Sequence, residues 1–207
     1  MSRKLCPKLI IEGPRLTGKT DLALALNDHP KLKGRRKYPY VGGLISAEWS
    51  GLSKDGWGES LITFQPDNEH LAMAAYAHWT GLFSTLQHYR WIIDRFHIST
   101  LVYQKKHRGR APDFTELEQN LLELGFHIVL LTRTSESFEK ARQARLEVSA
   151  QPSQYDDLQA IIDSSDDYRC AVSASRLPSR EFDVTERDPA MVANEVFCRP
   201  ACKIDPV

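Results

Sequence analysis

One stretch near the N-terminus constrains the fold more than any other. An apolar run at residues 9–11 predicts a short buried strand, and residues 13–20 after it read Gly-Pro-Arg-Leu-Thr-Gly-Lys-Thr. This is the G-x-x-x-x-G-K-[ST] pattern of a P-loop. Residues 19–26, Lys-Thr-Asp-Leu-Ala-Leu-Ala-Leu, then predict a helix. The chain therefore has strand, glycine-bounded loop and helix in the order that phosphate binding requires.

Each residue type in this loop has a physical task. Gly13 and Gly18 permit backbone angles that a Cβ atom would obstruct. The loop amides can then turn toward phosphate oxygens, supported by the positive end of the following helix. We expect Lys19 to reach the β- and γ-phosphates of ATP and the Thr20 hydroxyl to ligate Mg²⁺. The expected nucleotide contacts are Gly13, Pro14, Arg15, Leu16, Thr17, Gly18, Lys19, Thr20 and Asp21.

Composition narrows the class of protein. The 207 residues include 27 Lys and Arg against 27 Asp and Glu, so no net charge attracts nucleic acid or membranes. No apolar stretch approaches the roughly 18–20 residues that span a bilayer. The N-terminus lacks the apolar segment of a signal peptide, and the four cysteines are too scattered for a disulfide framework. We therefore expect a single cytoplasmic domain over residues 1–207, with no membrane partner.

Strand and helix signals alternate along the rest of the chain. Further strands are predicted at 40–45, 89–94, 126–131 and 181–184. Helices are predicted at 67–86, 95–106, 115–124, 155–176 and 189–197. Asp67 is the expected cap of the first of these, and Thr115 with Glu118, beside Asp113 with Glu116, offers an expected capping box for the helix at 115–124. The alternation predicts βα units around a parallel sheet, a three-layer α/β domain.

The predicted strand at 89–94 ends on Asp94, and Arg95 comes directly after it. In an open parallel sheet, ligands bind outside the carboxyl ends of the strands, where Gly13 also lies. Asp94 at such an end can hold a Mg²⁺-bound water or a reacting hydroxyl, and Arg95 can bind phosphate bidentately. A simple ion pair between the two is the alternative. The long connection at 46–66, rich in glycine and aromatic residues, is either a binding loop or a packed surface loop.

Arginines recur after the predicted strand at 126–131. Arg133, Arg142 and Arg145 lie mostly on a predicted polar helix. A mobile helix with this composition can close over a transferring phosphoryl group and neutralise its charge. A solvated amphipathic helix would carry the same residues, so both interpretations stay open.

Four motifs resemble the thymidylate-kinase-like branch of the P-loop nucleoside and nucleotide kinases. They are Ile-Glu-Gly-Pro with Gly-Lys-Thr in 11–20, Ile-Asp-Arg-Phe-His-Ile-Ser at 93–99, the arginines after Leu-Leu-Thr-Arg at 130–133, and Phe-Asp-Val-Thr at 182–185 with Pro-x-x-Val-Ala after it. Their order and spacing cover nearly the whole chain. The resemblance implies a P-loop NTPase fold with a five-stranded parallel sheet, and transfer of the γ-phosphoryl of Mg²⁺-bound ATP to a nucleoside or nucleoside monophosphate.

The resemblance also implies roles for individual residues. Asp94 and Arg95 would face the acceptor, and Arg142 or Arg145 would act from a lid segment at about 133–152. Thr185 would lie near the adenine. Glu12 would contact the acceptor base or sugar, or would only support the loop.

This chain departs from the family inside the P-loop. The family commonly has an acid-glycine pair there that contacts the acceptor sugar, and this chain has Arg15-Leu16 instead. A cation cannot accept a hydrogen bond from a sugar hydroxyl, so Arg15 is expected to meet an acceptor phosphate or the closed lid. Together with Arg95, it predicts an acceptor that already carries phosphate, a nucleoside monophosphate.

Other functions fit the same motifs less closely. A kinase acting on a hydroxyl of DNA or RNA would suit the basic stretch at 31–37, although the neutral overall charge disfavours binding to a polyanion. A non-nucleotide small-molecule kinase and an NTP-binding regulator are the remaining alternatives.

Overall fold

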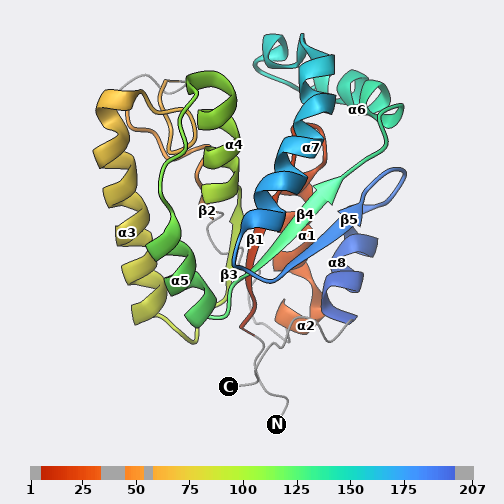
Figure 1. Ribbon diagram of the computed structural model, residues 1–207. Coiled ribbons are helices and arrows are strands. Elements are labelled where there is room, and N and C mark those ends of the chain that lie inside the picture. Colours follow the sequence, from red (N-terminus) through yellow and green to blue (C-terminus); the bar gives the residue numbers. More distant parts are fainter. Residues whose placement is uncertain (1–5, 34–44, 54–57, 199–207) are drawn as a thin grey trace.

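Five parallel strands form the central sheet of the computed structural model, which describes residues 6–33, 45–53 and 58–198 (Figure 1). The strands are β1 (Lys8–Glu12), β2 (Ile45–Ser46), β3 (Trp91–Asp94), β4 (His127–Thr132) and β5 (Ser179–Asp183). Their order across the sheet is β2-β3-β1-β4-β5. The P-loop strand β1 is therefore central, with β3 and β4 as its neighbours. The predicted α/β fold with five parallel strands is confirmed.

Helices connect the strands and cover both faces of the sheet (Figure 1). The α-helices are α1 (Lys19–Asp28), α2 (Pro30–Lys33), α3 (Glu69–Thr85), α4 (His97–Arg108), α5 (Thr115–Glu123), α6 (Ser137–Leu146), α7 (Leu158–Ala174) and α8 (Pro189–Cys198). Two short 3₁₀ helices are η1 (Pro66–Asn68) and η2 (Pro152–Tyr155). In the described ranges, no helix has the length and apolarity needed to cross a bilayer.

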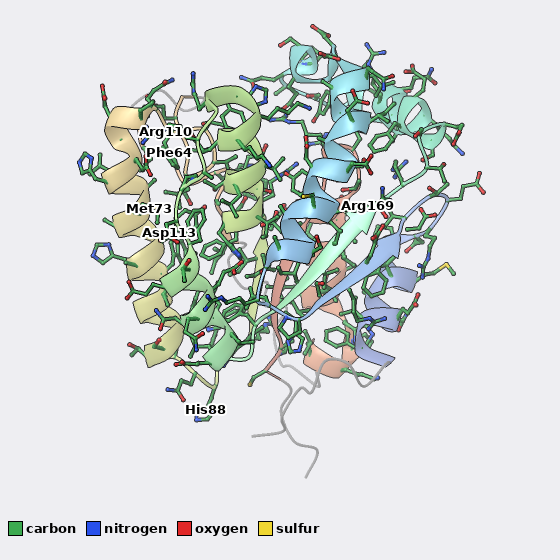
Figure 2. All side chains as sticks on the ribbon, in the orientation of Figure 1. Phe64, Met73, His88, Arg110, Asp113 and Arg169 are labelled. Carbon is green, nitrogen blue, oxygen red and sulfur yellow. The ribbon has the colours of Figure 1, made fainter. Side chains whose placement is uncertain are left out.

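Alternation along the strands separates the core into two layers. Successive strand residues point to opposite faces. Ile10 of β1 accordingly packs with the buried side chains of α3, α4, α5 and α7, whereas Leu9 and Ile11 pack with those of α1 and α8. A salt bridge also joins α7 to the sheet. Nε of Arg169 in α7 lies 3.0 Å from Oε1 of Glu181 in β5 (Figure 2). The sheet and the helices on its two faces make three layers. The carboxyl ends of β1, β3 and β4 lie together at one edge of the sheet.

Several predicted boundaries differ from the observed ones by a few residues. The second strand was predicted at 40–45; β2 (Ile45–Ser46) extends one residue beyond that end, and residues 40–44 lie outside the described ranges. Asp67 does not cap the following helix, because it lies inside η1 and α3 begins at Glu69. Proline at the start of η1 pre-sets the tight turn in which Asp67 is held.

The capping box predicted for α5 is also wrong. The N-cap of this helix is Phe114, and no side chain caps it; Asp113, one residue earlier, accepts a hydrogen bond of 2.9 Å at Oδ1 from the Thr115 amide. Glu118 turns toward the core and accepts hydrogen bonds from the Ser175 hydroxyl at 2.6 Å and the Arg176 amide at 3.1 Å. Its Oε1 also lies 3.1 Å from Nε2 of His97. Burial alone would raise the pKa of Glu118, but these hydrogen bonds lower it to about 2.

Gly13 lies where β1 ends and the P-loop passes directly against β4. Its φ is 141°, and a Cβ atom at this position would lie 2.3 Å from the carbonyl oxygen of Leu131. A side chain here would therefore push against the backbone of a central strand. The first glycine of the loop is required by packing as well as by backbone conformation.

We expect Gly13→Ala to lower the free energy of unfolding by about 3 kcal/mol, since it adds a backbone clash to an unfavourable φ. Gly125→Ala is the matched control, because Gly125 has a φ of 79° and a Cβ atom there would meet no heavy atom within 4 Å. The control should cost only about 1–2 kcal/mol. Urea unfolding of both variants measures the difference. Equal losses of unfolding free energy would show that the backbone at Gly13 shifts and relieves the clash.

Candidate functional site

The P-loop has the conformation that its sequence predicts. It connects β1 to α1, and its backbone enters the left-handed region at Leu16 and Gly18, with φ of 68° and 69°. Thr17 stabilises the turn, because its hydroxyl donates to the carbonyl of Pro14 at 2.9 Å. The α1 ladder begins at Gly18, whose carbonyl accepts from the Leu22 amide at 2.9 Å. The loop thus stands at the positive end of a ten-residue helix.

Lys19 is buried beneath this loop. Its Nζ donates to the carbonyl of Pro14 at 2.5 Å and to the Thr17 hydroxyl at 3.3 Å. Burial and the positive charge of Arg95 lower the pKa of Lys19 well below its usual value. A bound anion beside Lys19 and Arg95 would raise the pKa of Lys19 and so oppose the effects of burial and of Arg95. The local electrostatics therefore favour a negatively charged ligand such as phosphate.

Thr20, in the first turn of α1, meets Asp94 at the end of β3. The Thr20 hydroxyl donates to Oδ2 of Asp94 at 2.6 Å. The other carboxylate oxygen, Oδ1, is buried and has no hydrogen-bond partner among the described residues. Oxygen ligands of this kind suit Mg²⁺, which is usually held by one or two protein oxygens together with substrate phosphates. The residues present therefore fit a magnesium ion held by Thr20 and Asp94.

Arg95 lies next to Asp94 but pairs with a different acid. Its backbone is left-handed, with φ of 62°, and its side chain is buried. Its Nε lies 3.0 Å from Oε2 of Glu48. Burial by itself would lower the pKa of Arg95, but Tyr168, Glu48, Asp94 and Glu12 together raise it, so the guanidinium stays charged. The alternative of a plain ion pair between Asp94 and Arg95 is not what the structure has.

Glu48 is the site residue that sequence reasoning missed. It follows β2 by two positions and bridges two arginines, with 3.0 Å to Arg95 and 3.3 Å to Arg15. Burial would raise the pKa of Glu48, but Arg95, Arg15 and Lys19 lower it, so the carboxylate is ionised. Its place at the carboxyl end of a strand was the one available signal. The strand itself was predicted imprecisely, so that signal was not recognised.

Glu12 supports the structure around the loop. It is fully buried, and its Oε1 accepts hydrogen bonds from the amides of Phe96 at 2.8 Å and Ser99 at 3.3 Å. Its Oε2 accepts from the Ser99 hydroxyl at 2.5 Å. Burial raises the pKa of Glu12 despite these donors. All these contacts are with the start of α4, so Glu12 joins the end of β1 to that helix, and both roles predicted for it stay predictions.

In the segment predicted to form a lid, Arg142 and Arg145 both contact one tyrosine. The segment contains α6, and η2 continues it to Tyr155. Nε of Arg142 donates to the Tyr155 carbonyl at 2.9 Å, and Nε of Arg145 donates to the Tyr155 hydroxyl at 3.1 Å. That hydrogen bond and the carboxylates of Asp21 and Glu48 raise the pKa of Arg145. Arg145 therefore lies within electrostatic range of the P-loop and of Glu48.

The tip of the P-loop is joined to the lid segment. Nη1 of Arg15 donates to Oε1 of Gln154 in η2. Leu16 packs against a small apolar cluster that includes Phe138 and Tyr155. Arg15 contacts Gln154, just beyond the predicted lid segment, and Glu48; its contact with an acceptor phosphate stays a prediction. Arg15 and Leu16 thus connect the phosphate-binding loop to the arginine-bearing helix.

The remaining predicted residues lie farther along this edge. The Thr185 hydroxyl accepts a hydrogen bond of 2.9 Å from the Thr134 amide, so it joins the loop after β5 to the loop after β4. Arg133 donates from Nη1 to the Ser137 carbonyl at 3.2 Å. Burial lowers the pKa of Arg133. Most of the basic stretch at 31–37 lies outside the described ranges.

Comparison with known proteins gives a fold rather than a family. No protein-family model matches the sequence, and no curated protein sequence is significantly similar to it. Among solved structures, the chain resembles the YorR protein of Bacillus subtilis, crystallised in complex with phosphorylated GDP. The TM-score is 0.54 and the identity 18%, over 91% of this chain and 92% of YorR. A gluconokinase from Sinorhizobium meliloti matches with a TM-score of 0.49 and 13% identity, over 98% of this chain and 93% of that one.

We expect Asp94→Asn to remove most of the effect of Mg²⁺ on nucleotide binding, because it neutralises the buried carboxylate beside Thr20. The gain in ATP affinity on adding Mg²⁺ should fall by about 10-fold or more. Calorimetric titration of ATP with and without Mg²⁺ measures it. Asp183→Asn is the control, since Asp183 also ends a strand of this sheet. An undiminished gain in the Asp94 variant would place the metal elsewhere.

Arg145→Ala should lower kcat by about 100-fold or more while changing ATP affinity little, because a group that stabilises only the transition state affects the chemical step. Steady-state kinetics and equilibrium ATP binding separate the two effects. Lys140→Ala is the control, since Lys140 is exposed on the same helix. A loss confined to ATP affinity would make Arg145 a ground-state contact.

Proposed function

We propose that this protein is an ATP-dependent phosphotransferase of the nucleotide-kinase type, with a nucleoside monophosphate as acceptor. The observation that carries the proposal is the contact of 2.6 Å between the P-loop Thr20 and Asp94. It joins the phosphate-binding loop to the strand end that carries Arg95. The donor and acceptor sides of a phosphoryl transfer would thus be adjacent. YorR, whose fold is similar, was crystallised with phosphorylated GDP, and this supports a nucleotide ligand.

The residues of this site would have separate roles in such a reaction. The P-loop amides and Lys19 would bind the β- and γ-phosphates of ATP. Thr20 and Asp94 would hold Mg²⁺, which neutralises phosphate charge when it is bound. Arg145 would approach the transferring group from the lid segment, where the charge of Glu48 already raises its pKa. Little covalent chemistry is needed from the protein, so positioning and charge carry the catalysis.

Charge balance on the acceptor side accommodates a monophosphate. Arg15 and Arg95 share the single carboxylate of Glu48, so this cluster keeps one net positive charge. Glu48 pairs with Nε of Arg95, but Nη2 of Arg95 has no hydrogen bond to any described residue. A monophosphate would bind in competition with the Glu48 carboxylate. The excess of positive charge and the remaining Nη2 donor of Arg95 therefore both favour this acceptor.

A second candidate is supported by Glu48 itself. An ionised carboxylate held 3.0 Å from Arg95 can accept the proton of a hydroxyl group that attacks the γ-phosphate. The acceptor would then be a nucleoside, or a hydroxyl of DNA or RNA. In this case Glu48 would act as general base. For a monophosphate acceptor, no base is required, because the attacking phosphate oxygen is already deprotonated.

The experiment that separates these functions is a competition assay with ATP as donor. Nucleosides, their monophosphates and short oligonucleotides are supplied at equal concentration, and Lys19→Ala serves as the inactive control. We expect the monophosphate to be phosphorylated fastest, and Glu48→Gln to lower its KM with little change in kcat. Faster phosphorylation of a hydroxyl acceptor, with a loss of about 10²–10⁴-fold in kcat for Glu48→Gln, would favour the second candidate. Equal activity in folded Lys19→Ala would exclude a P-loop kinase.

A further inference from the structure

The guanidinium of Arg95 is held on one side by a buried polar network. Its Nη1 donates to three acceptors: the Gly13 carbonyl at 3.2 Å, the Ser99 hydroxyl at 3.2 Å and the Tyr168 hydroxyl at 2.8 Å. Its Nε is 3.0 Å from Glu48. Its other amino group, Nη2, has no hydrogen bond to any residue in the ranges that the structure describes. Nη2 is therefore the donor that remains for a ligand.

The direction of each hydrogen bond in this network can be deduced. Arginine only donates, so the oxygens of Ser99 and Tyr168 both accept from Arg95. The Ser99 hydroxyl has a single hydrogen, which it donates to Glu12 at 2.5 Å. Between Ser99 and Tyr168, 3.0 Å apart, the hydrogen must then come from Tyr168. Both hydroxyls donate toward Glu12 and leave lone pairs for the guanidinium.

Tyr168 brings this contact from a distant part of the chain. It lies on α7, 73 residues after Arg95, and its side chain is buried in the core layer of α3, α4, α5 and α7. Burial raises the pKa of Tyr168, so its hydroxyl stays protonated at neutral pH and can donate to Ser99. A phenylalanine would supply the same apolar contacts. The hydroxyl is therefore the part of this residue that serves Arg95.

We propose that Tyr168, with Ser99, is a positioning residue that orients the Arg95 guanidinium so that Nη2 stays available to the phosphoryl acceptor. This inference rests on the proposed function, since the acceptor is the ligand that Arg95 would meet. Fixing the guanidinium in advance removes rotational freedom that the ligand would otherwise have to restrict on binding. The left-handed backbone of Arg95, with φ of 62°, adds to this because it sets the direction in which the side chain leaves the strand.

The test compares Tyr168→Phe with Tyr76→Phe. Tyr76 is a suitable control because it is equally buried, and its hydroxyl bonds Thr100 at 2.7 Å on the same helix as Ser99. Rotation of the Arg95 guanidinium is followed by NMR of the arginine side chains, with the resonances assigned from Arg95→Lys. Kinetics are measured with ATP and whichever nucleoside or nucleoside monophosphate the wild type phosphorylates fastest.

In Tyr168→Phe we expect faster guanidinium rotation, and an acceptor KM raised about 3- to 10-fold with the KM for ATP unchanged, as the loss of one buried hydrogen bond implies. Tyr76→Phe should leave both unchanged. Wild-type rotation in Tyr168→Phe, or equal effects in the two variants, would overturn the proposal. If Tyr168→Phe does not fold, Ser99→Ala makes the same test, and unaltered rotation there would overturn it. Because the NMR measurement needs no turnover, it separates this proposal from the proposed function.

Discussion

Two buried cations at the carboxyl edge of the sheet set the main physical constraint on this structure. Lys19 and Arg95 are close enough for the charge of one to lower the pKa of the other. Charges removed from water are costly unless they are paired. Asp94, Glu48 and Glu12 supply the compensating negative charge, and each comes from the end of a different strand or from the segment just after it. The charges can compensate one another only because the order of the strands places these strand ends side by side.

The same cluster connects the layers of the fold to one another. Glu12 ends β1 and accepts hydrogen bonds from the start of α4. Arg95 then reaches Tyr168 on α7, the helix that follows η2 and the lid segment. On the other side, Arg15 contacts Gln154 of η2. Gln154 and Tyr168 both follow the helix that carries Arg142 and Arg145, so the chain on the C-terminal side of α6 is bonded to residues beside the phosphate-binding loop.

Prediction succeeded where a local pattern has one physical explanation. The P-loop could be read directly, because its glycines are required by backbone angles and by the close approach to Leu131. The roles of Thr115 and Glu118 were predicted wrongly for the opposite reason. Their spacing fits a capping box, but Glu118 gains more from partners in α4 and after α7 than from the helix that carries it. A spacing rule cannot weigh partners that are distant in the sequence.

The sequence by itself determined the strand-loop-helix at residues 8–28, the alternation that yields a parallel sheet, and the position of Asp94 and Arg95 at a strand end. These features depend on neighbouring residues and on hydrophobic periodicity. Only the tertiary structure decided which charges meet. Glu48 joins Arg15 to Arg95, and Tyr168 reaches Arg95, because the order of the strands and the packing of α7 bring them together. Pairing between charges depends on distance in space, and local sequence does not encode that distance.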